Sequence, residues 1–297
     1  MRYENIDESF TFERIITSTS KSNIWLATEV GTKSSVVVKE LFLKKICDPQ
    51  HVWNERAVLE RLSALDFPRA PRLLGTSKNT ESLFIIMSLI EGAPLHMHML
   101  PGGFETDIVK HYFAQTLSIL EFLHDHDILY RDLKLSNLVL CDGRIFLVDF
   151  GTAKIMPNKL TKTNSVCGTT HAMAPEVLAG SEYGFECDFF SLGILLYEMI
   201  TGKPPVTFPV SSDNPKLTRD AIDLISSLLK ADPRERLCSF SALRASAYFA
   251  GHSSVWWNSV SWASSSEEDL PDFNPWIGTR FIHGNQTKNS VDVFDNF

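Results

Sequence analysis

The stretch from Tyr130 to Gly151 limits the possible folds of this 297-residue chain more than any other part of the sequence. It reads YRDLKLSNLVLCDGRIFLVDFG, a pattern typical of a loop, a β-hairpin and a second loop. Asp132 and Asn137 stand in the first loop, and Asp149 follows the apolar run that ends the hairpin. Phosphoryl transfer requires a carboxylate near a substrate hydroxyl, with an amide and a second carboxylate that hold Mg²⁺ on nucleotide phosphates. The stretch therefore predicts phosphoryl-transfer chemistry.

Composition favours a globular chain without a membrane span. Apolar residues make up 44% and charged residues 22%, and the chain is long enough to bury a sizeable core. The net charge of -8 gives no electrostatic case for a nucleic-acid partner. Five scattered cysteines suit a reducing compartment, and no apolar stretch is long enough to cross a bilayer. We expect a soluble intracellular protein, with the cytoplasm as its first location and the nucleus as a second.

Upstream of this stretch, the sequence predicts a small β-rich region with one helix. Residues 10–43 have the pattern of three antiparallel strands, and residues 82–92 that of a strand running into a glycine-containing link. Residues 48–65 predict an amphipathic helix with an Asp-Pro start signal. Taken alone, Lys39 on the third strand and Glu55 on the helix would be solvated surface residues. A lysine and a glutamate on successive elements can, however, form the ion pair that positions nucleotide phosphates.

Downstream, the sequence predicts a larger helical region. Residues 105–126 and 187–202 have helical patterns, and the second of these is apolar almost all round. A later amphipathic helix begins at Thr218 and is expected to end at Asp232-Pro233. Residues 152–173 form a polar segment with several hydroxyls, which predicts a mobile loop. Beyond residue 250 the composition shifts to serine, tryptophan and acidic residues.

Several motifs in a fixed order resemble those of the eukaryotic protein kinases from about residue 10 to residue 250. In sequence order they are Lys39, Glu55, the YRDLKLSN motif, Asp-Phe-Gly at 149–151, Ala-Pro-Glu at 174–176 and Asp188. Within that superfamily the chain is similar to the AGC group, close to the catalytic subunits of the cyclic-nucleotide-dependent kinases. The shared features are Phe12-Glu-Arg-Ile15, Tyr130 in place of the usual histidine, Ser165-Val-Cys-Gly-Thr169 and Pro271-Asp-Phe-Asn-Pro275.

The resemblance implies an α+β, bilobal protein kinase fold. A small antiparallel β lobe with one helix would precede a larger, mainly α-helical lobe. The corresponding domains would be residues 1–91 for the N-lobe with an N-terminal extension, 92–250 for the C-lobe and 251–297 for an AGC-type C-terminal tail. With so few residues before the N-lobe, we expect no regulatory module ahead of it.

The resemblance also implies roles for the residues of the site. Asp132 would be the catalytic base or orient the substrate hydroxyl, Lys134 would steady the transferring phosphoryl group, and Asn137 and Asp149 would hold Mg²⁺. Lys39, oriented by Glu55, would bind the phosphates of ATP. The adenine pocket would comprise Ile24, Val37 and Val139, Met87 as the gatekeeper and a hinge from Ser88 to Ile90. Structural roles fall to the stack of Leu59, Phe150 and Tyr130, anchored through Asp188, and to an ion pair between Glu176 and Arg236.

A regulatory site is implied by the same matching. Ser165 would be the activation-loop phosphosite for an upstream kinase, and the positions that would bind its phosphate are His51, Arg131 and Lys154. The other interpretation is a loop serine with unrelated basic neighbours. Phe294 and Phe297 resemble a C-terminal hydrophobic motif that docks beside the Glu55 helix, although they could instead be a frayed end.

The phosphate-covering loop departs from the family, because residues 17–24 contain no glycine where several are usual. Glycines adopt torsions that cost other residues about 1 to 3 kcal/mol, so nucleotide binding could be weakened roughly ten- to hundredfold. Two positions that would read arginines in a substrate carry Pro94 and Ser136. The segment between Pro205 and Thr218 is also too short for the usual extra helix. We therefore predict no arginine-directed substrate consensus.

Three functions remain as alternatives. The first is a serine/threonine kinase that depends on ATP and Mg²⁺ and phosphorylates protein substrates; Lys134 and Thr169 favour this class. The second is a pseudokinase that acts as a scaffold, and the third, a small-molecule phosphotransferase, fits poorly. The His-x-His pairs at 96–98 and 124–126 lack further metal ligands, and the tail tryptophans are expected to pack on the large lobe.

Overall fold

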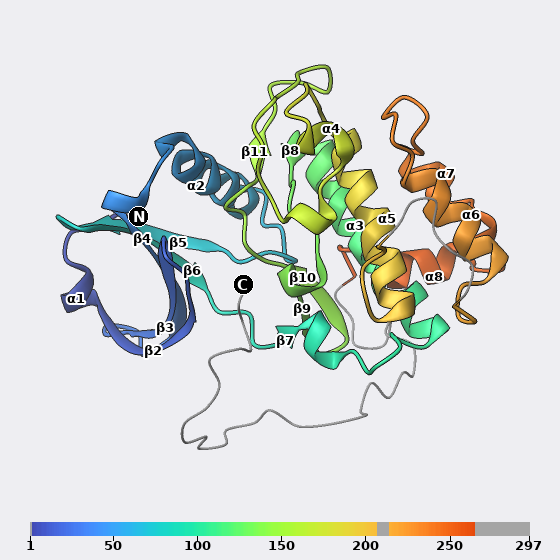
Figure 1. Cartoon of the computed structure of the whole chain (residues 1–297). Coiled ribbons are helices and arrows are strands. Elements are labelled where there is room, and N and C mark those ends of the chain that lie inside the picture. Colours follow the sequence, from blue (N-terminus) through green and yellow to red (C-terminus); the bar gives the residue numbers. More distant parts are fainter. Residues whose placement is uncertain (1, 207–213, 265–297) are drawn as a thin grey trace.

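The computed structural model describes residues 2–206 and 214–264 (Figure 1). Its first third is a six-stranded sheet in the order β1-β5-β6-β4-β3-β2. The strands are β1 (Arg2–Tyr3), β2 (Phe10–Ser18), β3 (Ser22–Glu29), β4 (Ser35–Phe42), β5 (Leu73–Lys78) and β6 (Ser82–Ser88). Only the short β1 pairs in parallel, with β5, and every other neighbour is antiparallel. The strands predicted over 10–43 and 82–92 are confirmed.

Helix α2 (Pro49–Ala64) lies across this sheet and carries Glu55 (Figure 1). Asp48 caps its start by accepting a hydrogen bond from the amide of Gln50 at 2.9 Å, and Pro49 occupies the first turn, where a missing N–H costs nothing. Its buried residues are Glu55, Val58, Leu59 and Leu62. The apolar stripe therefore holds the helix against the sheet with one carboxylate facing inward.

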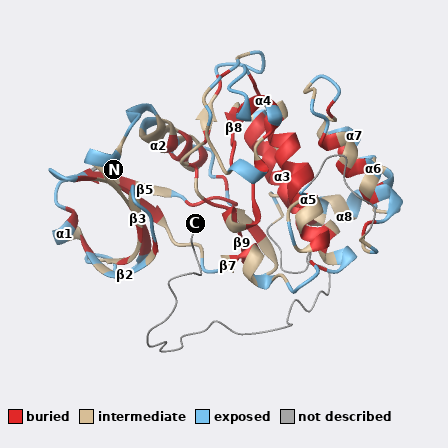
Figure 2. Ribbon diagram, viewed as in Figure 1, coloured by how far each residue is buried: buried red, intermediate tan, exposed pale blue. Residues whose placement is uncertain are grey.

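The remainder of the chain is mainly helical. Its helices are α3 (Thr106–Asp125), α4 (Pro175–Leu178), α5 (Glu186–Thr201), α6 (Arg219–Leu228), α7 (Phe240–Arg244) and α8 (Ser254–Ser259), while α1 (Ile6–Ser9) lies between β1 and β2. Short strands form two small sheets, β7 (Ala93–Pro94) with β9 (Leu138–Cys141) and β10 (Arg144–Leu147), and β8 (Ile128–Leu129) with β11 (Lys154–Ile155). Helices α3 and α5 are buried along most of their length (Figure 2).

The later helix is shorter than predicted, because α6 ends at Leu228 and not at Asp232-Pro233. Two features stop it. Pro233 has no N–H to donate to the carbonyl four residues earlier, and the carbonyl of Lys230 accepts hydrogen bonds from the guanidinium of Arg236 at 3.0 and 3.1 Å. The two lobes and the α+β fold are as predicted.

Candidate active site

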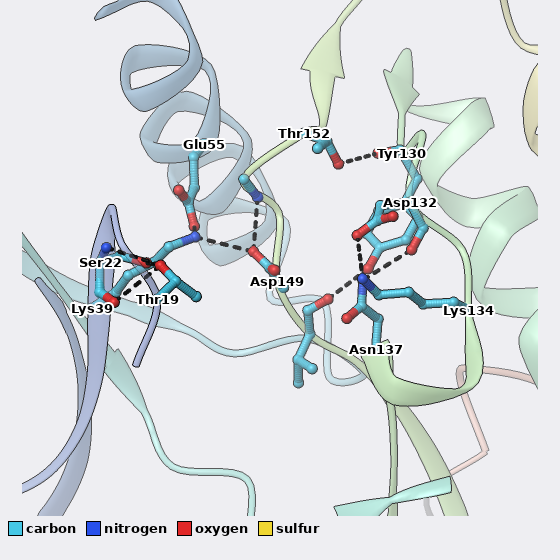
Figure 3. Close-up of polar contacts among 12 residues, drawn as sticks. Thr19, Ser22, Lys39, Glu55, Tyr130, Asp132, Lys134, Asn137, Asp149 and Thr152 are labelled. Carbon is cyan, nitrogen blue, oxygen red and sulfur yellow. Dashed lines mark hydrogen bonds and ion pairs between the residues drawn. The ribbon is translucent and has the colours of Figure 1, made fainter. Parts of the chain in front are cut away.

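Three charged side chains from three separate segments meet at the junction of the lobes. The ammonium nitrogen of Lys39 on β4 lies 2.6 Å from Oε1 of Glu55 on α2 and 3.0 Å from Oδ1 of Asp149 (Figure 3). Lys39 and Glu55 are both buried. Gly151 leaves room beside them, since a Cβ there would lie 3.0 Å from the Lys39 nitrogen. The predicted pair therefore forms and includes Asp149.

Burial and charge act in opposite directions within this cluster. Burial alone would lower the pKa of Lys39, but the carboxylates of Asp149 and Glu55 raise it, so the ammonium stays charged. Burial raises the pKa of Glu55, and the neighbouring Asp149 adds to that rise while Lys39 opposes it. Two carboxylates share one cation, which leaves the cluster with a negative charge and suited to a further cation.

The catalytic loop places Asp132, Lys134 and Asn137 together. Oδ2 of Asp132 accepts a hydrogen bond from Nδ2 of Asn137 at 3.0 Å and pairs with the Lys134 nitrogen at 3.0 Å. Lys134 also donates to the hydroxyl of Thr169 at 2.7 Å. Val148 donates its amide to the carbonyl of Asn137 at 2.9 Å, so the next residue, Asp149, begins beside the loop.

Asp188 at the start of α5 fixes the backbone of this loop. Its carboxylate accepts hydrogen bonds from the amides of Tyr130 at 3.0 Å and Arg131 at 2.7 Å, and it contacts Nε2 of His124 at 2.9 Å. Arg131 has φ +73°, a conformation that costs a side-chain-bearing residue free energy and persists only where the surroundings impose it. The hydrogen bonds to Asp188 therefore stabilise the strained backbone of Arg131, the residue immediately before Asp132. His124 had no role in the sequence prediction, because its contact depends on tertiary packing.

The catalytic loop presents two buried oxygens, of which the amide oxygen of Asn137 would be the Mg²⁺ ligand. Oδ1 of Asp132 and Oδ1 of Asn137 are buried, and neither has a hydrogen-bond partner within the described residues. Buried polar atoms are nearly always satisfied, so such oxygens indicate a missing partner. Carboxylate and amide oxygens are typical Mg²⁺ ligands, and Asp149 supplies a further carboxylate. The residues therefore fit a magnesium site.

A cleft between the lobes has the features of a nucleotide pocket. It is lined by Ile24, Val37, Lys39, Glu55, Pro71, Met87, Ser88, Leu89, Ile90, Val148 and Asp149. All predicted adenine contacts except Val139 are in this set. Val139 is buried on β9 against Gly92, where a Cβ would lie 2.7 Å from its Cγ1, so its contact with adenine stays a prediction.

Comparison with known proteins decides the family, because residues 10–249 match the protein kinase domain. The chain belongs to the protein kinase domain family. It is 28% identical to the Arabidopsis thaliana serine/threonine-protein kinase AtPK1/AtPK6, over 96% of this chain and 63% of that protein. It is 33% identical to Saccharomyces cerevisiae YPK2/YKR2 over 77% of this chain and 36% of that protein.

A third relative is protein kinase C zeta type of Oryctolagus cuniculus, 31% identical over 81% of this chain and 44% of that protein. The chain spans less than two thirds of the length of each of these relatives. They support the predicted resemblance of this kinase domain to the AGC group.

Contacts between the motifs of the large lobe form as the resemblance implies. The rings of Tyr130 and Phe150 are 5.5 Å apart, and the Tyr130 hydroxyl donates to the carbonyl of Val148 at 2.6 Å. Arg236 binds both carboxylate oxygens of Glu176, at 2.6 and 2.9 Å. These contacts brace the kinase domain around the site without touching the reacting groups.

The predicted phosphate-binding set around Ser165 forms only in part. Arg131 donates to the Ser165 hydroxyl at 2.6 Å, and Lys154 donates to Thr163 at 3.2 Å, two residues away. His51 does not reach Ser165 and lies 3.4 Å from the carboxylate of Asp48 on its own helix turn. The aspartate that caps α2 thus lies beside the histidine here, and binding of a Ser165 phosphate by His51 stays a prediction.

The glycine-free loop of the kinase domain closes without the torsions that glycine provides. No residue between Thr17 and Ile24 has a positive φ. The hydroxyl of Thr19 accepts hydrogen bonds from the amides of Lys21 at 3.2 Å and Ser22 at 3.1 Å, and the Thr19 amide donates to the Ser22 carbonyl at 2.8 Å (Figure 3). The strain expected from the missing glycines is therefore absent from this turn.

Other expectations concern the rest of the chain. Phe294 and Phe297 lie outside the described residues. Trp256, Trp257 and Trp262 pack against the core as predicted. Within residues 2–206 and 214–264, no group of three or more histidine, cysteine or acidic side chains is placed to hold a metal ion. No helix of that described part is long and apolar enough to cross a membrane.

Proposed function

We propose that this chain is a serine/threonine protein kinase that transfers the γ-phosphoryl group of ATP to hydroxyls of protein substrates. The observation on which this depends is the pairing of Lys39 with Glu55 beside Asp149, opposite the buried, unpartnered oxygens of Asp132 and Asn137. This arrangement provides phosphate binding on one side and hydroxyl activation on the other.

Each side chain has a separate task. Lys39, held by Glu55, binds and orients the phosphates of the nucleotide. Asn137 and Asp149 would hold Mg²⁺, whose positive charge would offset the negative charge of the phosphates. Asp132 accepts the proton of the substrate hydroxyl or orients that hydroxyl for in-line attack. Lys134, positioned by Asp132 and Thr169, steadies the transferring group.

Finer features of the proposal come from the resemblance. The domain would be close to the cyclic-nucleotide-dependent kinases, with boundaries at residues 91 and 250. Phosphorylation of Ser165 by an upstream kinase and docking of the hydrophobic motif at Phe294 and Phe297 would regulate it. We place it in the cytoplasm first and in the nucleus second, without a nucleic-acid partner.

A pseudokinase scaffold is the second candidate function, favoured by the loop of residues 17–24 without glycine. Against it stands the strain-free closure of that loop, together with the complete set of Lys39, Glu55, Asp132 and Asn137. The scaffold would bind partners through the same fold and transfer phosphate slowly or not at all.

One assay separates the two functions. Purified protein is incubated with labelled ATP, Mg²⁺ and a mixed protein substrate, beside the variants Asp132→Asn and Asp149→Ala. We expect phosphoserine or phosphothreonine in the substrate and loss of at least a hundredfold in rate in both variants. Transfer that survives both substitutions would come from a contaminant and would refute the catalytic proposal.

A further inference from the structure

A buried tyrosine outside the predicted site packs against the activation loop, a name used for residues 152–173. Tyr183 is 0% exposed. Its hydroxyl donates to the backbone carbonyl of Ser165 at 2.5 Å and accepts from Nη1 of Arg131 at 3.2 Å. Burial raises the pKa of Tyr183 to about 12, so the phenol keeps the proton that it donates.

The backbone of Tyr183 holds the same loop. The amide of Thr163 donates to the Tyr183 carbonyl at 2.9 Å, and the amide of Tyr183 donates to the Thr163 carbonyl at 2.8 Å. The side chain of Thr163 in turn accepts from Lys154 at 3.2 Å. Tyr183 therefore bonds to Thr163 and Ser165 through the phenol and through both main-chain groups.

The segment that Tyr183 holds rests on the catalytic loop. Gly168 has φ +105°, and a Cβ there would lie 2.4 Å from the carbonyl oxygen of Arg131 and 3.6 Å from Oδ1 of Asp132. This close approach is open only to glycine and fixes the distance between the two loops. A displacement of residues 163–168 would therefore remove support from the backbone beside Asp132.

The unmodified Ser165 already completes this arrangement. Its hydroxyl accepts from the guanidinium of Arg131 at 2.6 Å, and Arg131 also donates to the carbonyl of Thr152 at 2.5 Å. The guanidinium that a phosphate on Ser165 would bind thus already donates hydrogen bonds to the uncharged serine and to the phenol.

We propose that Tyr183 is a positioning residue that holds the activation loop against the catalytic loop while Ser165 is unmodified. The kinase would then be active without a phosphate on Ser165. The inference rests on the proposed function. A phosphate on Ser165 would bind Arg131 through stronger, charge-assisted hydrogen bonds, so the contribution of the phenol would fall when Ser165 is phosphorylated.

The test compares Tyr183→Phe with a matched control, Tyr248→Phe. Tyr248 is also buried in the large lobe, but its hydroxyl has no hydrogen-bond partner within the described residues. We expect Tyr183→Phe to lower kcat of the unmodified protein about five- to tenfold, the factor for one buried hydrogen bond, with KM for ATP within twofold. Tyr248→Phe should leave both parameters within twofold.

Phosphoserine incorporated at position 165 during translation provides the second arm. There we expect Tyr183→Phe to lower kcat less than twofold. An equal loss in the unmodified and phosphorylated proteins, no loss in either, or an equal loss in Tyr248→Phe would overturn the proposal.

Hydrogen exchange separates this inference from the proposed function, because it needs no activity. In an Asp132→Asn background, Tyr183→Phe should speed amide exchange at residues 163–166 at least fivefold relative to Tyr248→Phe. If the protein showed no phosphoryl transfer that depends on Asp132, the proposed function would fail. Faster exchange would still support the role of Tyr183 in holding the activation loop. Unchanged amide exchange at these residues would overturn the proposed role of Tyr183, whatever the activity of the protein.

Discussion

At the scale of single residues, the site depends on pairs whose members come from distant parts of the sequence. Glu55 is the clearest example, since its carboxylate is buried and lies 2.6 Å from the Lys39 nitrogen. Burying a charge without a partner is costly, so each member keeps the other in place. The position of Lys39, the proposed phosphate-binding group, therefore depends on Glu55.

Replacing Glu55 with glutamine tests that dependence. Glu55→Gln removes the charge but not the volume, and leaves Lys39 to pair with Asp149 alone. We expect kcat/KM for ATP to fall about 10- to 100-fold, in line with about 1.5 to 3 kcal/mol for a hydrogen bond to a charged group. Glu60→Gln is the matched control, because Glu60 is half exposed on the same helix and pairs with Arg56. Steady-state kinetics at varied ATP provide the measurement, and equal effects of the two substitutions would contradict the prediction.

Glu198 on α5 predicts a pH dependence of stability. Burial raises its pKa from 4.5 to about 7. The folded state then keeps a proton that the unfolded state loses between these values, so the free energy of unfolding should decrease as pH rises from about 4.5 to 7. The order of magnitude is about 2–3 kcal/mol.

Glu198→Gln should remove this decrease, stabilising the protein by about 2–3 kcal/mol at pH 8 and little at pH 4.5. Urea unfolding at both pH values measures it, with the exposed Glu182→Gln as the control. A stabilisation independent of pH would refute the titration of Glu198 as the cause.

At the scale of elements, the turn between β2 and β3 shows how a loop without glycine keeps its shape. The Thr19 hydroxyl stabilises the turn, because it accepts hydrogen bonds from two backbone amides, those of Lys21 and Ser22. Side-chain hydrogen bonds also hold the two ends of the turn. Ser18 donates to the side chain of Asn23 at 2.8 Å, and Asn23 donates to Glu40 at 3.1 Å.

Thr19→Val keeps the shape of the side chain and removes the hydroxyl. With two amides left open, the turn should become mobile and KM for ATP should rise about three- to tenfold at nearly constant kcat. Ser20→Ala is the control, since Ser20 is an exposed hydroxyl at the same turn. The measurement is again initial rate against ATP concentration. A KM for Thr19→Val within twofold of that for Ser20→Ala would show that the loop holds its shape by other means.

Elements with strong periodicity or clear start signals could be predicted from the sequence, and others could not. Helix α2 was expected over 48–65 and forms at Pro49–Ala64 because Asp48, Pro49 and the apolar stripe agree. Strand β5 (Leu73–Lys78) was not predicted, since it is short and half polar and depends on pairing with β6. The end of α6 was missed because it depends on Arg236, a side chain beyond the helix.

The same distinction applies to the site. Lys39, Asp132, Asn137 and Asp149 could be predicted because the chemistry demands those groups at motif spacings. The placement of His51 could not, because a local partner, Asp48, competes with a distant one. The role of Tyr183 was equally invisible, since its contacts join segments 18 to 52 residues apart in the sequence.

At the scale of the whole molecule, the end of the described chain ties the two lobes together. Trp262 packs on Phe122 of α3 at 4.6 Å between ring centroids and on Phe67, which follows α2, at 5.6 Å. Arg69 donates to the carbonyls of Trp262 at 3.1 Å and of Ser264 at 2.5 Å. Residues beyond the helical lobe thus fasten the segment between α2 and β5, and through it the helix that carries Glu55.

Trp262→Ala should therefore affect both stability and activity. Loss of a large aromatic side chain that is partly buried should lower the free energy of unfolding by about 2–3 kcal/mol, somewhat less than for a fully buried tryptophan. Because the lost contacts join the lobes, kcat/KM for ATP should also fall several-fold at a temperature where the variant is folded. Trp53→Ala is the matched control, since Trp53 is 60% exposed on α2 and its loss should cost under about 0.5 kcal/mol. Urea unfolding and ATP kinetics on both variants give the comparison. A destabilised Trp262→Ala variant with unchanged ATP kinetics would mean that this contact stabilises the large lobe without positioning Glu55.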